Sequence, residues 1–224
     1  MRKYNTIIFD LDGTLLNTLE DLAEAVNYAL KKYGGPHRSI DEVRQFVGNG
    51  IRKLMIRAVP QGEENLRFEE MFTAFKEYYG AHCNDRTCPY PGIKELLARL
   101  KEEGYRLAIV SNKADFAVKE LQKIYFAEEI EVAIGEKEGI LRKPAPDTVN
   151  QALRELGSVR KEAVYVGDSD VDIKTAENAG MPCISVTWGF RDREFLKEHG
   201  AGIFADTADD LEKYLQEADE KMAE

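Results

Sequence analysis

Short apolar runs without alternation recur along the chain, and each is bordered by segments with helical spacing. A strand that is covered by helices on both faces of a parallel sheet has this continuous apolar pattern. Strands that alternate with helices predict an α/β protein with a doubly wound, Rossmann-like parallel sheet. The runs that we expect to form strands are Thr6–Phe9, Leu107–Val110, Ala163–Val166, Pro182–Val186 and, at an edge, Ile203–Ala205.

Residues 15–85 interrupt this alternation of strands and helices. Apolar residues from Leu19 onwards keep helical spacing, and no strand pattern follows within the segment. Ser39 and Glu42 have the spacing of a capping box, which marks the start of a helix. We therefore expect an all-helical domain inserted into the domain that carries the sheet. The expected boundaries are 15–85 for the helical insert and 1–14 with 86–224 for the sheet domain.

Polar side chains follow the ends of the predicted strands. In open α/β sheets, ligands bind outside the carboxyl ends of the strands, at one edge of the sheet. We therefore expect these side chains to converge on one rim and to form a site there. The residues concerned are Asp10, Asp12, Ser111, Asn112, Lys143, Asp168 and Asp172.

The carboxylates at this rim need compensation, because mutual repulsion and burial both disfavour their ionised forms. Asp10 and Asp168 would face each other across adjacent strand ends. Such oxygen ligands suit Mg²⁺, which keeps several waters and is completed by a substrate phosphate. Asp10 and Asp12 share one face of an extended chain. One of them can therefore attack a small substrate as a nucleophile while the other donates a proton.

Cationic and hydroxyl groups at the same rim suit a phosphate. We place Lys143 over the nucleophile, where its ammonium would hold a phosphate and balance the aspartates. Pro144 stiffens this loop and favours extended backbone at Lys143. Ser111 and Asn112 are expected to end a strand and open a helix, so that their side chains and backbone N–H groups offer donors to phosphate oxygens.

Composition restricts the partners and the compartment. The chain of 224 residues has a formal net charge of −10 and lacks the basic field that nucleic-acid binding needs. It has no apolar run long enough to span a bilayer, and its first residues lack the apolar core of a secretion signal. The three cysteines suit a reducing compartment. We expect a cytoplasmic protein with no nucleic-acid and no membrane partner.

Four sequence motifs carry a family resemblance. They are FDLDGTL at 9–15, SNK at 111–113, RKPAPD at 142–147 and GDSDVD at 167–172. In this order they resemble the motifs of the haloacid dehalogenase superfamily, and the helical insert is similar to the cap that many members carry. The resemblance covers essentially the whole chain. Three further segments, VGNG at 47–50, YPG at 90–92 and NAGM at 178–181, are similar to phosphoglycolate phosphatase-like enzymes.

The resemblance implies a role for each carboxylate. Asp10 would be the nucleophile that forms an aspartyl-phosphate, and Asp12 the general acid and then the base for water. Asp10, the backbone carbonyl of Asp12, and Asp168 would hold Mg²⁺. Asp172 would be a second carboxylate near the metal, either binding it through water or orienting Lys143.

The remaining motif residues are implied to bind phosphate. Ser111 and Lys143 would hold the transferred phosphoryl group, with Asn112 beside them. Gly13 and Thr14 would shape the loop and aim backbone N–H groups at the phosphate.

By the same resemblance, domain 15–85 is a cap that excludes water from the rim and chooses the leaving group. Gly48 and Gly50 allow a ligand to approach closely. We hypothesise that Arg52 or Lys53, which follow them, meets a carboxylate of the substrate. A capped enzyme of this size is expected to be a monomer.

The function that we expect is Mg²⁺-dependent hydrolysis of a small phosphorylated metabolite, with phosphoglycolate as the leading candidate. The presence of Asp12 as a general acid favours phosphoryl transfer over dehalogenation. A pyrophosphatase and a phosphosugar mutase remain open, because the same core serves all three activities. A non-catalytic binding module is a more distant alternative, since no expected catalytic group is missing.

Overall fold

The computed structural model describes residues 2–220 and divides the chain into two compact units. The sheet unit consists of Met1–Leu15 and Pro89–Glu224, and the helical unit consists of Leu16–Cys88. The chain therefore leaves the sheet unit after its first strand and the following loop, and returns shortly before helix α5 (Ile93–Glu102). The role of the helical unit as a cap stays a prediction.

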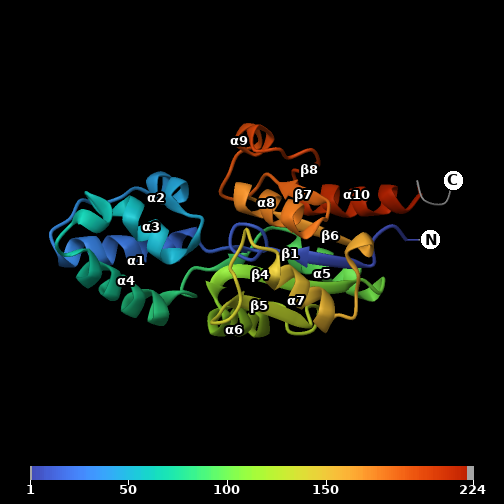
Figure 1. Cartoon of the computed structure of the whole chain (residues 1–224), viewed down its shortest axis with the longest axis horizontal. Coiled ribbons are helices and arrows are strands. Elements are labelled where there is room, and N and C mark those ends of the chain that lie inside the picture. Colours follow the sequence, from blue (N-terminus) through green and yellow to red (C-terminus); the bar gives the residue numbers. More distant parts are fainter. Residues whose placement is uncertain (1, 221–224) are drawn as a thin grey trace. The chain divides into compact units, whose positions relative to one another are not determined.

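The sheet unit contains six strands in the order β5-β4-β1-β6-β7-β8, and the pairings between them are parallel (Figure 1). The predicted doubly wound parallel sheet is confirmed. Phe9 of β1 pairs with Ile109 of β4 on one side and with Val166 of β6 on the other. The carboxyl ends of these three strands therefore meet at one rim. The strands are β1 (Thr6–Phe9), β4 (Arg106–Ala114), β5 (Val132–Glu136), β6 (Ala163–Gly167), β7 (Cys183–Val186) and β8 (Phe204–Ala205).

The five predicted strands are present, and β8 lies at an edge of the sheet as expected. Sequence analysis misses β5 at the other edge, because its short apolar run stands among charged residues and shows no clear period. β4 extends past Val110 to Ala114, and α6 begins only at Asp115. The expectation that Ser111 and Asn112 open a helix is therefore wrong, since both lie on extended backbone.

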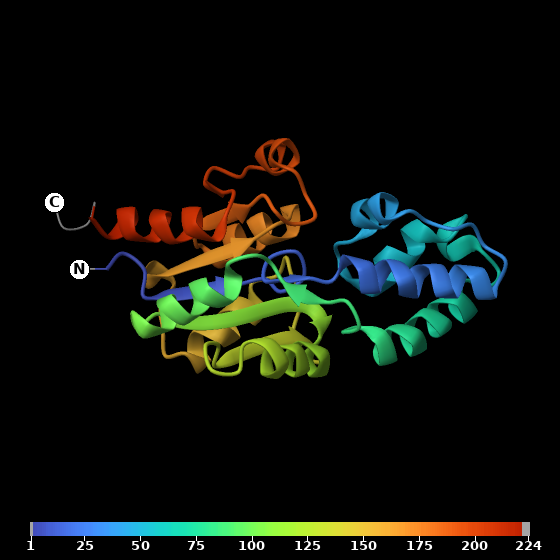
Figure 2. The same ribbon diagram turned by 180° about the vertical axis from the view of Figure 1, so that it is seen from behind.

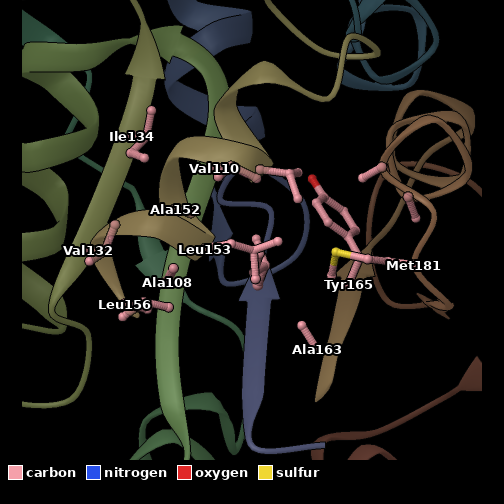
Figure 3. Close-up of a cluster of buried hydrophobic side chains, with 14 residues drawn as sticks. Ala108, Val110, Val132, Ile134, Ala152, Leu153, Leu156, Ala163, Tyr165 and Met181 are labelled. Carbon is pink, nitrogen blue, oxygen red and sulfur yellow. The ribbon is translucent and has the colours of Figure 1, made fainter. Parts of the chain in front are cut away.

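Helices cover both faces of the sheet. Apolar residues of α7 and α8 join those of β1, β4, β5 and β6 in one buried cluster, which Figure 3 shows around Tyr165. Figure 2 shows α5 and α6 on the opposite face. The helices of this unit are α5 (Ile93–Glu102), α6 (Asp115–Tyr125), α7 (Asp147–Glu155), the short η2 (Arg160–Glu162), α8 (Asp170–Ala179), α9 (Arg193–Glu198) and α10 (Ala208–Glu220).

The helical unit is built from four helices around buried residues such as Leu30, Met55 and Phe75. The predicted capping box is present, because Glu42 N donates to Ser39 Oγ at 3.2 Å and Ser39 N donates to the Glu42 carboxylate at 2.8 Å. The two short strands were not expected. The elements are β2 (Leu16–Asn17), α1 (Leu19–Lys32), α2 (Ile40–Phe46), α3 (Gly50–Ala58), η1 (Gly62–Glu64), α4 (Phe68–His82) and β3 (Cys88–Pro89), with β2 pairing with β3.

Within residues 2–220, every helix is too short or too polar to cross a membrane.

Candidate active site

The ammonium of Lys143 lies between two carboxylates at the rim. Its Nζ is 2.7 Å from Oδ1 of Asp10 and 2.8 Å from Oδ1 of Asp172. Asp10 follows β1 directly, and its N–H donates to the carbonyl of Val166 in β6 at 2.9 Å, which fixes its backbone beside that strand. Lys143 comes from the loop between β5 and α7 and is buried. The fold thus brings together two residues that are far apart in the sequence.

Asp172 is surrounded by hydrogen-bond donors. Its Oδ1 accepts from the hydroxyl of Tyr165 at 3.0 Å as well as from Lys143, and Lys143 also donates to the Tyr165 hydroxyl at 3.1 Å. Its Oδ2 accepts from N of Ser169 at 3.1 Å and from its Oγ at 2.5 Å, in the capping box that starts α8. In Figure 3 the Tyr165 hydroxyl points toward the end of the sheet at which the β1 arrow ends. Both oxygens of Asp172 are therefore engaged, which suits the expected role of orienting Lys143.

Asp168 is held from both sides by the protein backbone and by Thr14. Its Oδ1 accepts from Oγ1 of Thr14 at 3.1 Å, and its Oδ2 accepts from the backbone N of Phe190 at 2.7 Å. Gly13 and Gly189 pack against the same carboxyl group, and a Cβ on either of them would lie within 2.5 Å of an Asp168 atom. The position of Asp168 is therefore fixed by the loops after β1 and β7.

Burial and neighbouring carboxylates raise the pKa values of Asp10 and Asp168. Burial and the neighbouring Asp172 carboxylate raise the pKa of Asp168 to about 7. Burial and Asp172 also hold the pKa of Asp10 well above its usual range, against the lowering effect of Lys143. Burial alone would lower the pKa of Lys143, but the Asp10 and Asp172 carboxylates raise it, so this lysine stays charged. The cluster carries more negative charge than one ammonium offsets.

The carboxylates can hold a divalent cation. One oxygen each from Asp10, Asp168 and Asp172 lies within 4.8 Å of the others, and all three residues are buried. Hard carboxylate oxygens and an excess of negative charge fit Mg²⁺. Because Asp172 is engaged with Lys143, Tyr165 and Ser169, Asp10 and Asp168 are the side chains that suit direct ligation.

Asp12 pairs with a lysine that sequence analysis leaves without a role. Nζ of Lys113 is 2.9 Å from Oδ1 of Asp12, and only 6% of the Lys113 side chain and 18% of the Asp12 side chain are exposed. Lys113 stands near the end of β4, two residues after Ser111, and its N–H donates to Ser111 Oγ at 3.2 Å. Asp12 therefore projects toward β4, whereas Asp10 projects toward Lys143.

The other predicted phosphate-binding residues lie in the same rim loops. Ser111 is buried at the end of β4, and the side-chain amide of Asn112 donates to the carbonyl of Lys143 at 3.0 Å. The buried Oδ1 of Asn112 has no partner among the described residues. The N–H of Thr14 donates to the carbonyl of Leu11 at 3.3 Å, in the turn that starts the loop. Phosphate binding by these residues and by Gly13 stays a prediction.

In the helical unit, Arg52 is committed to neighbours within that unit. Its guanidinium pairs with the carboxylates of Glu63 and Glu69 and lies 5.1 Å from the ring centre of Phe68. Lys53 is exposed to solvent on the same helix. The preceding Gly48–Gly50 loop has positive φ at each of its three residues. Recognition of substrate by Arg52 or Lys53 stays a prediction.

Sequence analysis missed several groups that hold the site together. Tyr165 lies inside an apolar strand and gives no signal of a polar contact, and the backbone N–H of Phe190 is invisible in any sequence. The indole N–H of Trp188 also donates to the carbonyl of Thr14 at 3.0 Å. Asn178, within the NAGM segment, donates to the carbonyl of Pro144 at 2.8 Å and so supports the Lys143 loop.

The rim thus combines a strand-end aspartate, a second acid two residues on, a buried lysine and a carboxylate cluster, which is the constellation of a phosphoryl-transfer enzyme. A family model of haloacid dehalogenase-like hydrolases matches residues 7–186. The chain belongs to the haloacid dehalogenase-like hydrolases.

Similar proteins indicate which members of this family the chain resembles. A phosphoglycolate phosphatase from Mesorhizobium japonicum is 33% identical over 193 residues, which are 84% of each chain. A protein from Bacillus cereus named pyrophosphatase PpaX is 29% identical, over 93% of this chain and 95% of the relative. A crystal structure from Lactobacillus delbrueckii subsp. bulgaricus, provisionally named a phosphoglycolate phosphatase, has a TM-score of 0.92 at 38% identity, over 96% of this chain and 99% of that one.

These comparisons confirm the predicted resemblance to phosphoglycolate phosphatase-like members of the superfamily. The protein is a phosphoric monoester hydrolase of this family.

Proposed function

We propose that the protein is an Mg²⁺-dependent phosphatase that hydrolyses a small phosphomonoester through an aspartyl-phosphate on Asp10, with 2-phosphoglycolate as the leading substrate. The observation that carries this proposal is the position of Asp10, which contacts the ammonium of Lys143 and lies within ligand-sharing distance of Asp168. A carboxylate that is placed between a cation and a metal-binding partner is suited to attack a phosphate dianion, because both neighbours offset the repulsion. The name of the Mesorhizobium relative supports the choice of substrate.

In the first step, an oxygen of Asp10 attacks phosphorus. The new bond from this oxygen to phosphorus forms as the bond to the leaving oxygen breaks, and Asp12 gives its proton to the leaving oxygen. In this proposal Lys143, Ser111 and Asn112 hold the other oxygens of the phosphoryl group, which is supported by the burial of Lys143 and Ser111 and by the contact of Asn112 with the carbonyl of Lys143.

In the second step, water attacks the phosphorus of the aspartyl-phosphate. Asp12 now takes the proton from this water, because the carboxylate left by the first step is a base. The bond between Asp10 and phosphorus breaks and inorganic phosphate is released. Asp12 is again protonated and Asp10 is again a free carboxylate, so the cycle closes without another reactant.

Asp10 and Asp168, with the backbone carbonyl of Asp12, would hold Mg²⁺. The ion would supply positive charge against the carboxylates and the substrate phosphate. Asp172 acts on Lys143 instead, because each of its oxygens already accepts hydrogen bonds from the protein. Gly13 and Thr14 shape the loop around Asp168.

Pyrophosphate is the second candidate substrate, because the Bacillus cereus relative is named a pyrophosphatase. The same two steps apply to it, with inorganic phosphate as the leaving group. In either case we propose that the helical unit serves as the cap and that Lys53 or Arg52 takes part in choosing the leaving group. The three cysteines of the chain suit a reducing compartment, the cytoplasm, as the site of action.

The test is phosphate release from 2-phosphoglycolate, pyrophosphate and a sugar phosphate, with Mg²⁺ and with a chelator, for the wild-type protein and for Asp10→Asn. Asp209→Asn is the matched control, because the side chain of Asp209 is 92% exposed. We expect Mg²⁺-dependent release that disappears in Asp10→Asn and persists in the control. Release that persists in Asp10→Asn would exclude the aspartyl-phosphate, and no release from any ester would exclude the phosphatase.

The role of the helical unit needs separate variants. Arg52→Ala and Lys53→Ala are compared with the wild-type protein by kcat/KM for 2-phosphoglycolate. A loss in one of them supports recognition of the substrate carboxylate, and unchanged values in both exclude these residues from it.

A further inference from the structure

Two lysines are buried among the described residues, Lys113 and Lys143, and both lie at the rim. Lys143 lies between Asp10 and Asp172, as described above. Lys113 belongs to a second ion pair, in which its Nζ lies 2.9 Å from Oδ1 of Asp12. A lysine side chain is rarely buried without a partner, because removing its ammonium from water is costly unless nearby anions offset the loss of hydration.

We propose that Lys113 is a specificity residue that selects substrates whose leaving group carries a negative charge. This inference rests on the function proposed above and deepens it. Phosphoglycolate and pyrophosphate, the substrates in the names of the relatives, share this feature, since glycolate and phosphate are both anions.

The position of Lys113 follows from the extension of β4. Ser111 and Lys113 both lie in the last part of β4, where the pairing with β5 shifts register between Val110 and Ala114, and the N–H of Lys113 donates to Ser111 Oγ at 3.2 Å. The side chain of Lys113 thereby reaches Asp12 from the strand that also carries the predicted phosphate-binding serine.

The ion pair leaves one oxygen of Asp12 for the substrate. Lys113 contacts Oδ1, whereas Oδ2 of Asp12 has no hydrogen-bond partner among residues 2–220. In the proposed reaction Asp12 exchanges its proton with the leaving oxygen, so the leaving group stands beside Asp12. Lys113, whose ammonium contacts Asp12, is then a buried cation on the side of the leaving group, whereas Lys143 contacts Asp10 and Asp172.

An anionic leaving group brings a further negative charge to a rim that already holds several carboxylates. In a poorly solvated site this charge is repelled by the carboxylates of the rim unless a cation offsets it. Lys113 provides that cation, whereas a neutral leaving group has no need of it. Removing the charge of Lys113 should therefore affect the two kinds of substrate differently.

The experiment compares 2-phosphoglycolate with 2-hydroxyethyl phosphate, which has a neutral hydroxymethyl group in place of the carboxylate. We measure kcat/KM for both with Mg²⁺ in the wild-type protein, in Lys113→Met, which keeps the apolar stem, and in Lys113→Arg, which keeps the charge. Lys119→Met is the control, because the side chain of Lys119 is 51% exposed and pairs with Asp115. Melting temperatures show whether each variant is folded.

We expect Lys113→Met to reduce kcat/KM on 2-phosphoglycolate by a factor about ten times larger than on 2-hydroxyethyl phosphate. This difference corresponds to about 1.4 kcal/mol, the energy expected of one lost charge pair. Lys113→Arg should keep the wild-type ratio between the two esters, and so should the control. An equal loss on both esters would overturn the proposal and leave Lys113 as a structural partner of Asp12. If Lys113→Met does not fold, Lys113→Arg is compared with the wild type by the ratio of kcat/KM on 2-phosphoglycolate to kcat/KM on 2-hydroxyethyl phosphate. A ratio within twofold of the wild-type ratio, at unequal absolute rates, supports the proposal. A ratio that falls toward one overturns it.

The proposed phosphatase function fails in a different way. If the wild-type protein releases phosphate from neither ester nor from pyrophosphate, the function itself is wrong, and the inference falls with it. If the wild type hydrolyses the esters and only the ratio is insensitive to Lys113, the function stands and the inference alone is wrong.

Discussion

Gly13 lies directly against the carboxyl group of Asp168. Its neighbour Thr14, which stands 154 positions before Asp168 in the sequence, donates a hydrogen bond to the same group. A Cβ built on Gly13 would lie 2.4 Å from Oδ2 of Asp168, and the backbone of Gly13 has a φ of +88°. Only glycine tolerates both conditions, because other residues are strained at positive φ and carry the Cβ that collides. The glycine after the second aspartate therefore allows the loop after β1 to meet the carboxylate after β6.

Gly13→Ala is expected to displace Asp168 and to reduce kcat/KM for the preferred ester by at least about a hundredfold, because a displacement of about 1 Å is enough to misalign a reacting group. The change is also expected to lower the free energy of unfolding by roughly 1–2 kcal/mol through backbone strain. Gly104→Ala is the matched control, since Gly104 has a φ of +86° and no atom within 4 Å of a built Cβ. Steady-state kinetics and urea unfolding separate the two effects, and equal activity losses in both variants would contradict the contact argument.

Asp168→Asn is expected to raise the melting temperature of the metal-free protein. The substitution removes one negative charge from a cluster in which burial and Asp172 already disfavour ionisation, and Asn can still accept the N–H of Phe190. Mg²⁺ should raise the melting temperature of the wild type and have little effect on the variant. Thermal unfolding with Mg²⁺ and with a chelator measures both shifts. A wild-type melting temperature that ignores Mg²⁺ would argue against a metal site at this rim.

Lys143→Met is expected to abolish detectable hydrolysis and to lower the free energy of unfolding by about 3 kcal/mol, because it leaves Asp10 and Asp172 buried without their shared cation. Lys174→Met serves as the control, since the side chain of Lys174 is 55% exposed and pairs with Glu177 on the surface. Urea unfolding in the presence of a chelator gives the stability difference. A Lys143→Met protein as stable as the control would show that the carboxylates do not depend on this ammonium.

Tyr165→Phe is expected to lower kcat about fivefold with KM nearly unchanged, because the ring stays in the core while Lys143 and Asp172 lose one hydrogen-bond partner worth about 1 kcal/mol. The loss should appear in kcat, since the position of Lys143 matters most when charge develops on the phosphoryl group. Steady-state kinetics with Mg²⁺ measure the split. An increase in KM at constant kcat would contradict a role in orienting Lys143.

A surface ion pair gives a prediction for acid stability. Arg99 contacts both carboxylate oxygens of Glu212 at 2.8 Å, and this contact lowers the pKa of Glu212 from its usual value of 4.5. A carboxyl group whose pKa is lower in the folded than in the unfolded state stabilises the fold at pH values above the unfolded pKa. This stabilisation is lost as the pH falls through the folded pKa. Glu212→Gln should therefore cost about 0.5–1 kcal/mol at about pH 7 and less at about pH 3.

Urea unfolding at the two pH values tests this prediction. Glu217→Gln is the control, because Glu217 is 50% exposed and lies 3.8 Å from its partner Lys213. A difference between Glu212→Gln and the wild type that is the same at both pH values would show that ionisation of Glu212 is not the cause.

Taken alone, the sequence predicts the fold class, the location of most strands along the chain and the set of polar residues at the strand ends. Continuous apolar runs such as Thr6–Phe9 have few alternatives to a buried strand, and a parallel sheet brings the carboxyl ends of its strands to one rim. The same reasoning could not find β5, because its burial depends on helices α6 and α7 that pack against it. It also placed the start of α6 too early, and so overlooked the strand positions of Ser111 and Lys113.

The ion pairs of the rim could be identified from the tertiary structure and not from the sequence. The sequence offered Lys143 as the cation of the site, and it gave no reason to pair Lys113 with Asp12 or to place the hydroxyl of Tyr165 between Lys143 and Asp172. The physical reason is that local pattern reports burial and backbone preference within a few residues, whereas an ion pair depends on distances between segments that only packing sets. For this protein the sequence determined which residues stand at the rim, and the fold decided their partners.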